Sequence, residues 1–418
     1  MKPAKLRVLV ITTMFPNPAL PNFGVFVARR LRAASSLADL EILSPVPWFP
    51  FGTRLGRYRH RRLIPDRSEV LGLTVRYPRY LSLPRYMKPL DGIFLAASIW
   101  WACRGSRFDV IDAQLAFPEG WAARLLAAIR GVPYCITVRG HDVNHLPEFP
   151  VRGRQVRYAL RGAARVMSVA EALRRCVISL GGPEERTETI PNGVDTEIFR
   201  PIPKEEACAR LKLDPGRRYL VSVGHLVERK GHHILIEALG LLKARGRPIP
   251  TLAIVGAPSE EGDHSSVLRE LISRHGLDRE VILAGEQSVQ MLPHWYGAAD
   301  ALCLASSKEG WANVLLESLA CGTPVIGTRV WGTPEVISEE WLGILVERDA
   351  ESFADAFEKL AGKSFRQEDL VRHASKFTWE RAGTRLAANY RLAHAMSFAS
   401  NGPSALRPGG LPPGSGRP

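Results

Sequence analysis

The sequence predicts an α/β protein with two Rossmann-like domains, each a doubly wound parallel sheet, that face each other across a cleft. Short β-branched runs alternate with amphipathic stretches of helical length, and this alternation occurs twice along the chain. The runs are continuously apolar, which is typical of parallel strands that helices cover on both faces. The length of 418 residues also exceeds that of one ordinary domain, so two domains are expected.

The first series of runs predicts an N-terminal domain at 1–195. Its strands are expected at Leu6–Thr12, Leu40–Ser44, Val70–Tyr77, Phe108–Ala113, Tyr134–Val138, Arg165–Val169 and Thr187–Ile190. Helices are expected between most of these strands, including Gly24–Ser36, Glu119–Ile129 and Ala170–Leu180. Such an order of elements predicts a parallel sheet.

A stretch with three prolines at 196–217 interrupts the pattern and predicts a linker. The alternation resumes in a second domain at 218–375. Its strands are expected at Tyr219–Val223, Thr251–Val255, Val281–Ala284, Ala301–Leu304, Pro324–Gly327 and Gly343–Val346, and its helices at His232–Ala244, Ser266–His275, Val289–Ala298 and Asn313–Cys321. The segment 397–418 is rich in Pro, Gly and Ser and is expected to be disordered.

The chain is strongly basic, with a formal net charge of +14. In Arg54–Lys88, ten basic residues are accompanied only by Asp66 and Glu69. This excess fits a solvated surface, an anionic membrane face or an anionic substrate. Nucleic acid is not expected as a partner, because the basic residues belong to no known nucleic-acid-binding module.

Cysteine usage and hydropathy indicate a cytoplasmic protein that is soluble or peripheral to a membrane. The six cysteines are scattered without a CxxC pair, which suits neither a zinc site nor a disulfide framework. We expect no signal peptide, because the apolar run Val8–Thr12 lacks a small-residue cleavage site. The longest apolar stretch, Ile93–Cys103, is too short to span a bilayer.

Several common catalytic motifs are absent from the sequence. It contains no GxxxxGK[ST] loop, no GxGxxG after the first strand and no GxSxG, which argues against P-loop ATPases, ordinary dinucleotide dehydrogenases and α/β-hydrolases. No DxD pair follows a strand, and no metal ligand set is expected.

The most informative segment is Glu309–Glu317, which follows a predicted strand and opens a predicted helix. Free backbone N–H groups near Asn313 and Val314 can bind a phosphate, aided by the helix dipole. Glu317 could accept hydrogen bonds from a ribose diol, and Glu309 would point toward whatever the phosphates carry. The plainer alternative is a helix start with two surface acids.

Two further loops follow predicted strands. Arg229 and Lys230 suit a diphosphate that gains negative charge as it departs. An ordinary exposed pair of cations would have the same sequence pattern. Arg139, His141 and Asp142 cluster where an N-terminal sheet would meet the cleft; each could instead be a structural hydrogen-bonding residue.

Together these segments resemble the retaining family 4 glycosyltransferases of the two-domain GT-B fold over roughly residues 6–395. The resemblance rests on Ser307–Glu335, with its two glutamates eight residues apart and Gly332-Thr-Pro-Glu335, and on Ile190–Asp195 and Val223–Gly231. The N-terminal motifs Phe108–Ala113, Phe117–Gly120 and Arg139–Asn144 are most similar to enzymes that build bacterial cell-surface polysaccharides of the teichuronic acid type.

The resemblance implies an acceptor-binding N-terminal domain, a nucleotide-sugar-binding C-terminal domain and a helix at 376–396 that crosses back. Glu317 would hold the donor ribose, and Glu309 would lie by the transferred sugar. Lys230 would neutralise the leaving diphosphate. The residues expected to line the donor phosphates are Gly24, Gly310, Trp311, Asn313 and Val314.

Two positions depart from the family pattern. His225 stands where the family has Arg, and we expect Arg229 to compensate in part. Arg139 stands where many members have His, so His141 is shifted by two residues. We still expect His225 and Arg139 beside the donor, and His141 and Asp142 among the catalytic groups.

The implied activity is retaining transfer of a sugar from a UDP- or GDP-linked donor to a glycan or lipid-linked acceptor, in exopolysaccharide or cell-surface polysaccharide synthesis, without metal or other cofactor. The alternatives are an epimerase or a phosphorylase on the same fold, or a degenerate partner subunit. Aromatic residues interleave with the basic ones, which suggests an acceptor on an anionic membrane at its inner face. They are Trp48, Phe49, Phe51, Tyr58, Tyr77, Tyr80 and Tyr86.

Overall fold

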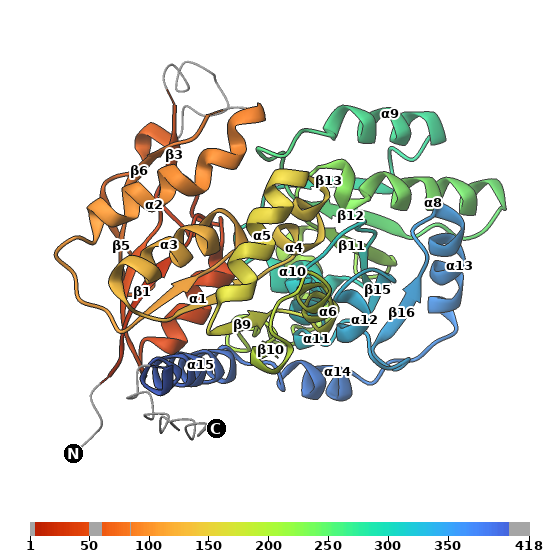
Figure 1. Cartoon of the computed structure of the whole chain (residues 1–418). Coiled ribbons are helices and arrows are strands. Elements are labelled where there is room, and N and C mark those ends of the chain that lie inside the picture. Colours follow the sequence, from red (N-terminus) through yellow and green to blue (C-terminus); the bar gives the residue numbers. More distant parts are fainter. Residues whose placement is uncertain (1–4, 50–60, 84, 401–418) are drawn as a thin grey trace, which may run out of the picture.

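The N-terminal half forms an eight-stranded sheet in the computed structural model, which describes residues 5–49, 61–83 and 85–400 (Figure 1). In spatial order its strands are β10 (Thr187–Thr189), β9 (Arg165–Ser168), β8 (Tyr134–Val138), β7 (Val110–Ala113), β1 (Arg7–Ile11), β2 (Asp39–Leu43), β5 (Leu73–Arg76) and β4 (Arg67–Val70). All neighbours are parallel except β4 and β5. The predicted parallel sheet is therefore confirmed.

Helices cover both faces of this sheet, as the continuous apolar runs predicted. Along β1, Val8 and Val10 pack with helices α1 (Val25–Ala34) and α15 (Trp379–Ser400). Leu9 and Ile11 pack on the opposite face, because successive strand residues point to opposite sides. The helices of that face are α2 (Asp91–Ala102), α3 (Trp121–Arg130), α4 (His141–Asn144), α5 (Pro150–Gly162) and α6 (Glu171–Ser179).

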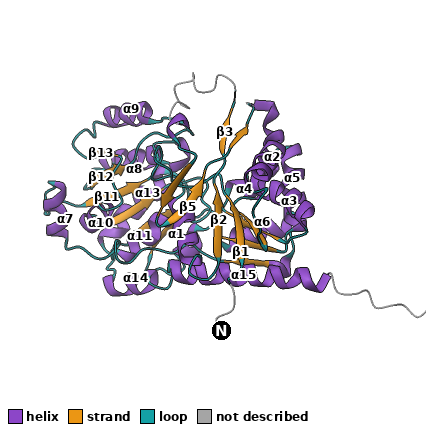
Figure 2. Ribbon diagram, turned by 90° about the vertical axis from the view of Figure 1, so that its left-hand side faces the viewer, coloured by secondary structure: helices purple, strands orange, loops and turns teal. Residues whose placement is uncertain are grey.

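The C-terminal half contains a six-stranded parallel sheet, in which the first and fourth strands of the domain lie side by side at its centre. In spatial order these are β13 (Val281–Gly285), β12 (Thr251–Val255), β11 (Tyr219–Val223), β14 (Ala301–Leu304), β15 (Val325–Thr328) and β16 (Gly343–Val346). The helices are α8 (His232–Ala244), α9 (Ser265–His275), α10 (Leu292–Ala298), α11 (Asn313–Ala320), α12 (Thr333–Val336), α13 (Ala350–Ala361) and α14 (Gln367–Ala374). This strand order is that of a Rossmann domain, and Figure 2 shows the two sheets side by side.

The prediction of one strand at Val70–Tyr77 is wrong. Leu71 and Gly72 both adopt left-handed backbone conformations, with φ of 50° and 72°, and they turn the chain between antiparallel β4 and β5. Two consecutive positive φ values are the mark of a tight hairpin turn. Outside the main sheets, β3 (Val46–Trp48) and β6 (Arg79–Leu81) pair in parallel.

The chain passes between the domains twice. After β10 it reaches the short helix α7 (Lys204–Leu211), within the predicted linker. At the other end, α15 leaves the C-terminal domain and packs against α1. Because α15 runs to Ser400, the tail expected from residue 397 begins inside a helix, and 401–418 lie outside the described residues. Within the described part of the chain, no helix combines the length and apolarity needed to cross a membrane.

The crossing of α15 over α1 depends on Gly383. A Cβ atom there would lie 2.6 Å from Ala33 Cβ and 2.7 Å from the Ala33 carbonyl carbon. Gly383→Val should therefore destabilise the protein by about 2 kcal/mol or more through overpacking. Denaturant unfolding measures this, with Gly105→Val as control because nothing lies within 4 Å of Gly105. Equal stability of the two variants would show that the helices do not meet this closely.

Candidate active site

The two loops that carry the predicted C-terminal site residues leave neighbouring central strands. β11 is followed by a loop and a 3-10 turn at Glu228–Lys230, and β14 is followed by the loop that leads into α11. Gly231, with φ of 72°, joins the turn to α8, and a side chain there would collide with the Ala305 carbonyl. Ligands of open α/β sheets bind where the strand order reverses, and both loops lie at that point.

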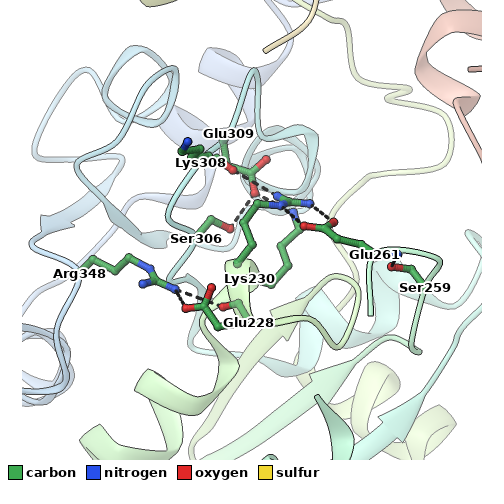
Figure 3. A network of polar contacts seen from close by, with 9 residues as sticks. Glu228, Lys230, Ser259, Glu261, Ser306, Lys308, Glu309 and Arg348 are labelled. Atoms are coloured by element: carbon green, nitrogen blue, oxygen red, sulfur yellow. Dashed lines mark hydrogen bonds and ion pairs between the residues drawn. The ribbon is translucent and has the colours of Figure 1, made fainter. Parts of the chain in front are cut away.

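Lys230 and Glu309 form the centre of this site. Lys230 Nζ donates to Glu309 Oε1 at 2.7 Å, and the Ser306 hydroxyl donates to the same oxygen at 2.7 Å (Figure 3). The two charged side chains are only 15% and 11% exposed. Burial by itself would raise the pKa of Glu309, but Lys230 and the Ser306 hydroxyl outweigh it and lower the pKa below its usual value. The site thus holds a desolvated cation ready beside an ionised carboxylate.

Arg229 lies in the same turn but makes other bonds. It forms a bidentate ion pair with Glu261, with N···O distances of 2.8 and 2.9 Å, and Nη1 donates to the Lys308 carbonyl at 3.2 Å. Glu261 is the main cause of its raised pKa. His225, earlier in the loop, is exposed. The Arg229 guanidinium is already paired with Glu261. To bind a donor phosphate in place of the family's arginine at position 225, it would have to break this ion pair, and this role stays a prediction.

Glu317 lies on α11 with one carboxylate oxygen in a hydrogen bond. The Tyr296 hydroxyl, from α10, donates to Glu317 Oε2 at 2.9 Å. Burial raises the pKa of Glu317 to about 7. Its carboxyl group is therefore partly protonated near neutral pH. Tyr296 was not identified from the sequence, since nothing local marks a tyrosine 21 residues away as a partner.

The predicted phosphate-lining residues divide into backbone and side-chain contributions. Gly310 must be a glycine because a Cβ atom there would collide with the Arg139 carbonyl of the N-terminal domain. The Trp311 indole is buried and packs against the Phe377 ring, 5.7 Å between centroids, so only its backbone is available to a ligand. Val314 is half-buried at the start of α11.

Asn313 begins α11 and is held by the other domain. The Asn192 side-chain amide donates to Asn313 Oδ1 at 3.0 Å. Asn192 in turn accepts a hydrogen bond from buried Arg30 at 2.9 Å. Asn192 lies in the junction motif Ile190–Asp195, but its contact with the site could not be read from the sequence.

A second interdomain contact lies at the start of α6. The Glu335 carboxylate accepts hydrogen bonds from the backbone N–H groups of Glu171 and Ala172 at 2.7 and 2.8 Å. A carboxylate is favoured at a helix N-terminus by the free N–H groups and the dipole. Gly332, just before, packs against the Gly310 carbonyl and Ala170. The Gly332–Glu335 motif therefore joins the two domains beside the loop that is predicted to line the phosphates.

On the N-terminal side, Gly24 and Glu119 lie at the reversal point between β1 and β7. Gly24 has φ of 70°, and a Cβ atom there would lie 2.6 Å from the Met14 carbonyl carbon. Glu119 is fully buried and accepts from the Thr13 N–H at 2.9 Å and the Thr13 hydroxyl at 2.6 Å. Burial raises the pKa of Glu119 to about 7. No role for Glu119 was predicted from the sequence beyond its place in the motif Phe117–Gly120.

The three remaining predicted residues follow β8: Arg139 lies in the loop, and His141 and Asp142 lie in α4. Asp142 is 1% exposed, and it accepts hydrogen bonds from the backbone N–H groups of Ala116, Arg139 and Gly140 at 2.9, 3.1 and 3.0 Å. Its carboxylate is thus committed to shaping the loop. A catalytic part for it, as expected from the sequence, stays a prediction.

Arg139 and His141 point to different surroundings. The Arg139 guanidinium is buried, donates to Gln114 and lies 5.2 Å from the Phe26 ring centroid; burial lowers its pKa to about 10, so it stays charged. His141 is exposed and lies against His145, 4.8 Å between ring centroids. Partial desolvation of the ring by its neighbours, together with repulsion from His145, lowers the pKa of His141 below its usual value.

Two Rossmann-like sheets with polar loops meeting between them define the GT-B fold, and the comparison with solved structures agrees. The chain matches sucrose-phosphate synthase from Thermosynechococcus elongatus with a TM-score of 0.78 at 18% identity, covering 94% of this chain and all of that one. It matches Anabaena HepE in complex with UDP with a TM-score of 0.64 at 21% identity, covering 95% of this chain and all of that one.

Sequence comparison identifies the family. Residues 57–198 match the description "Glycosyltransferase Family 4", and residues 203–377 match "Glycosyl transferases group 1". A D-inositol 3-phosphate glycosyltransferase of Thermobispora bispora is 32% identical over 68% of this chain and 70% of its own. TuaC of Bacillus subtilis, named as a glycosyltransferase of teichuronic acid biosynthesis, is 27% identical over 84% of this chain and 88% of its own. The chain belongs to the family 4 glycosyltransferases and is a transferase.

The environment of Glu119 predicts a pH dependence of stability. Its pKa of about 7 in the folded protein exceeds the ordinary 4.5. The folded state therefore binds more protons between these values, and stability falls as pH rises through this interval. Glu119→Gln should flatten the loss of melting temperature between pH 5 and 7, which thermal unfolding at several pH values measures. An unchanged slope would mean that Glu119 is not buried as described.

Proposed function

We propose that this enzyme transfers a sugar from a UDP- or GDP-linked donor to a glycan or lipid-linked acceptor, with retention at the anomeric carbon. The observation that carries this proposal is the ion pair of Lys230 with Glu309 at the reversal point of the C-terminal sheet, beside the start of α11 and with Glu317 farther along that helix. This arrangement suits a nucleoside diphosphate, because a cation and free helix N–H groups can bind the phosphates and a carboxylate can accept hydrogen bonds from the ribose.

In this proposal Lys230 changes partner when the donor binds. The diphosphate takes the place of Glu309 at the ammonium group, and the freed Glu309 carboxylate faces the sugar. As the anomeric C–O bond breaks, the leaving diphosphate gains negative charge that Lys230 and the α11 amides stabilise. The acceptor oxygen bonds to the same face of the anomeric carbon, and its proton passes to the departing phosphate oxygen. No protein base is then required.

The likeness to TuaC supports cell-surface or exopolysaccharide synthesis as the pathway. The structures of HepE in complex with UDP and with UDP-glucose support a nucleotide-sugar donor. With such a donor and a lipid-linked acceptor, the enzyme would act at the cytoplasmic side of the cell membrane. An epimerase would convert the donor with no acceptor present, and a degenerate partner subunit would convert no nucleotide sugar at all. Assays of a panel of nucleotide sugars with and without acceptor therefore distinguish these alternatives from a transferase.

Loss of the Lys230 ammonium should slow the chemical step. Lys230→Met is expected to reduce kcat at least about 100-fold, because one preorganised charge contact is lost where charge develops. Steady-state assays at saturating donor measure this. Lys243→Met is the matched control, since that lysine lies on α8 and donates to the carbonyls of His275 and Gly276. Near-normal turnover of Lys230→Met would refute the proposed site.

Removal of the Glu309 charge should separate binding from turnover. In Glu309→Gln the ammonium of Lys230 no longer has an ionic partner, so a nucleoside diphosphate without sugar should bind more tightly than to the wild type. Turnover should nevertheless fall, because the carboxylate that faces the sugar is gone. Calorimetric titration with UDP and GDP, beside kcat, tests both. Weaker diphosphate binding together with normal turnover would contradict the exchange of partners.

A further inference from the structure

Helix α2 exposes an apolar face to solvent. Ile93, Trp100 and Trp101 are 47%, 39% and 67% exposed, and Ala97 is also exposed. The positions 93, 97, 100 and 101 recur at helical spacing, so they share one side of the helix. The other side, with Leu95 and Ile99, is buried against the sheet. A surface helix ordinarily carries polar residues on its outer side, and α2 does not.

Arginines stack on these tryptophans. The Arg104 guanidinium lies 4.2 Å from the Trp101 ring centroid, and that of Arg130 lies 4.7 Å from the Trp100 ring centroid. Beside Trp101 a hollow of about 440 Å³ runs between α2 and β6, and its lining includes Leu81, Phe94 and Ala97. Trp and Arg both carry an apolar body and a polar tip, which suits the boundary between lipid headgroups and acyl chains.

The adjoining helices α3 and α5 continue this surface with positive charge. Figures 1 and 2 show α2, α3 and α5 together on the outer side of the N-terminal domain, and α3 contacts both of the others. Their only acidic residue is Asp91, which is buried and paired with Lys88. The arginines of α3 and α5 are Arg124, Arg130, Arg152, Arg154, Arg157 and Arg161.

Exposed aromatic rings occur on this part of the surface as well. Phe149 and Tyr158 are 39% and 45% exposed. Arg152 lies 3.9 Å from the Phe149 ring centroid, and Arg124 lies 3.5 Å from that of Tyr158. The pattern of α2 therefore repeats on α5: an exposed ring with a guanidinium over it.

We propose that the α2–α3–α5 face, defined by these three helices, docks on a bilayer that contains anionic lipid. The Trp100, Trp101 and Ile93 side chains would enter the headgroup region, and the arginines would lie among the lipid phosphates. A purely polyanionic partner would engage the arginines and leave the apolar side of α2 in water. The inference does not depend on the transfer chemistry.

This location differs from the one that the sequence suggested. Within Arg54–Lys88, Tyr77 and Tyr80 are buried in the core at 1% and 6% exposure, so they cannot reach a membrane. Phe51 and Tyr58 lie outside the described residues, and so does the Tyr86 side chain. The exposed rings with arginines over them lie instead on, or beside, α2 and α5.

The test is flotation of the full chain with vesicles of phosphatidylcholine, with and without phosphatidylglycerol. Binding is expected only with phosphatidylglycerol, and it should weaken as salt rises. Each arginine near an anionic surface accounts for about fivefold in binding, so Arg104→Glu/Arg154→Glu should lose at least about 25-fold. Trp101→Ala should also weaken binding and reduce quenching of tryptophan fluorescence by brominated lipid.

Matched controls separate this surface from the rest of the molecule. Trp341→Ala changes a 41% exposed tryptophan of the C-terminal domain and should leave vesicle binding unchanged. Lys230→Met should also bind vesicles like the wild type, so failure of the transfer proposal and failure of this one give different results. The proposal is overturned if the wild type does not bind the vesicles, or if the Trp101 and arginine variants bind them as well as the wild type does. It is also overturned if sedimentation analysis shows that the wild type is a dimer and that Trp101→Ala makes it a monomer.

Discussion

Lys230 and Glu309 stand 79 residues apart in the chain, and the ion pair between them joins the loops after β11 and β14. Both groups are nearly buried, and breaking such a pair by removing one partner leaves an uncompensated charge with a cost of about 3–5 kcal/mol. Only a ligand that brings its own negative charge can therefore release Glu309. A diphosphate meets this condition, so in the proposed mechanism the ion pair that holds the two loops together also favours a ligand of this kind.

The rest of the molecule keeps this pair opposite the N-terminal domain. Gly310 touches the Arg139 carbonyl, Asn192 bonds Asn313, and Glu335 bonds the first N–H groups of α6. Each contact joins one domain to the loop or helix that adjoins the site in the other. The position of the Gly310–Asn313 loop is therefore coupled to the packing of the two domains through backbone atoms and polar side chains.

Much of the fold could be predicted, because parallel strands that are buried on both faces have continuous apolar runs in the sequence. The strands Tyr134–Val138 and Ala301–Leu304 have the predicted bounds. The hairpin at Leu71 was missed because a leucine rarely adopts a positive φ. At the site, Lys230 and Glu309 were predicted from loops that follow strands. The partners Tyr296, Asn192 and Glu261 could not be predicted, since each contact is formed only by tertiary packing, and the commitment of Asp142 to three backbone N–H groups has no sequence signature.

A crystal structure of the protein with UDP or GDP tests the central claim most directly. The account predicts Lys230 Nζ at hydrogen-bonding distance from a phosphate oxygen, the phosphates against the first amides of α11, the ribose against Glu317, and Glu309 no longer bonded to Lys230. A nucleotide bound elsewhere, or one bound at this site while Lys230 and Glu309 remain paired, would contradict it.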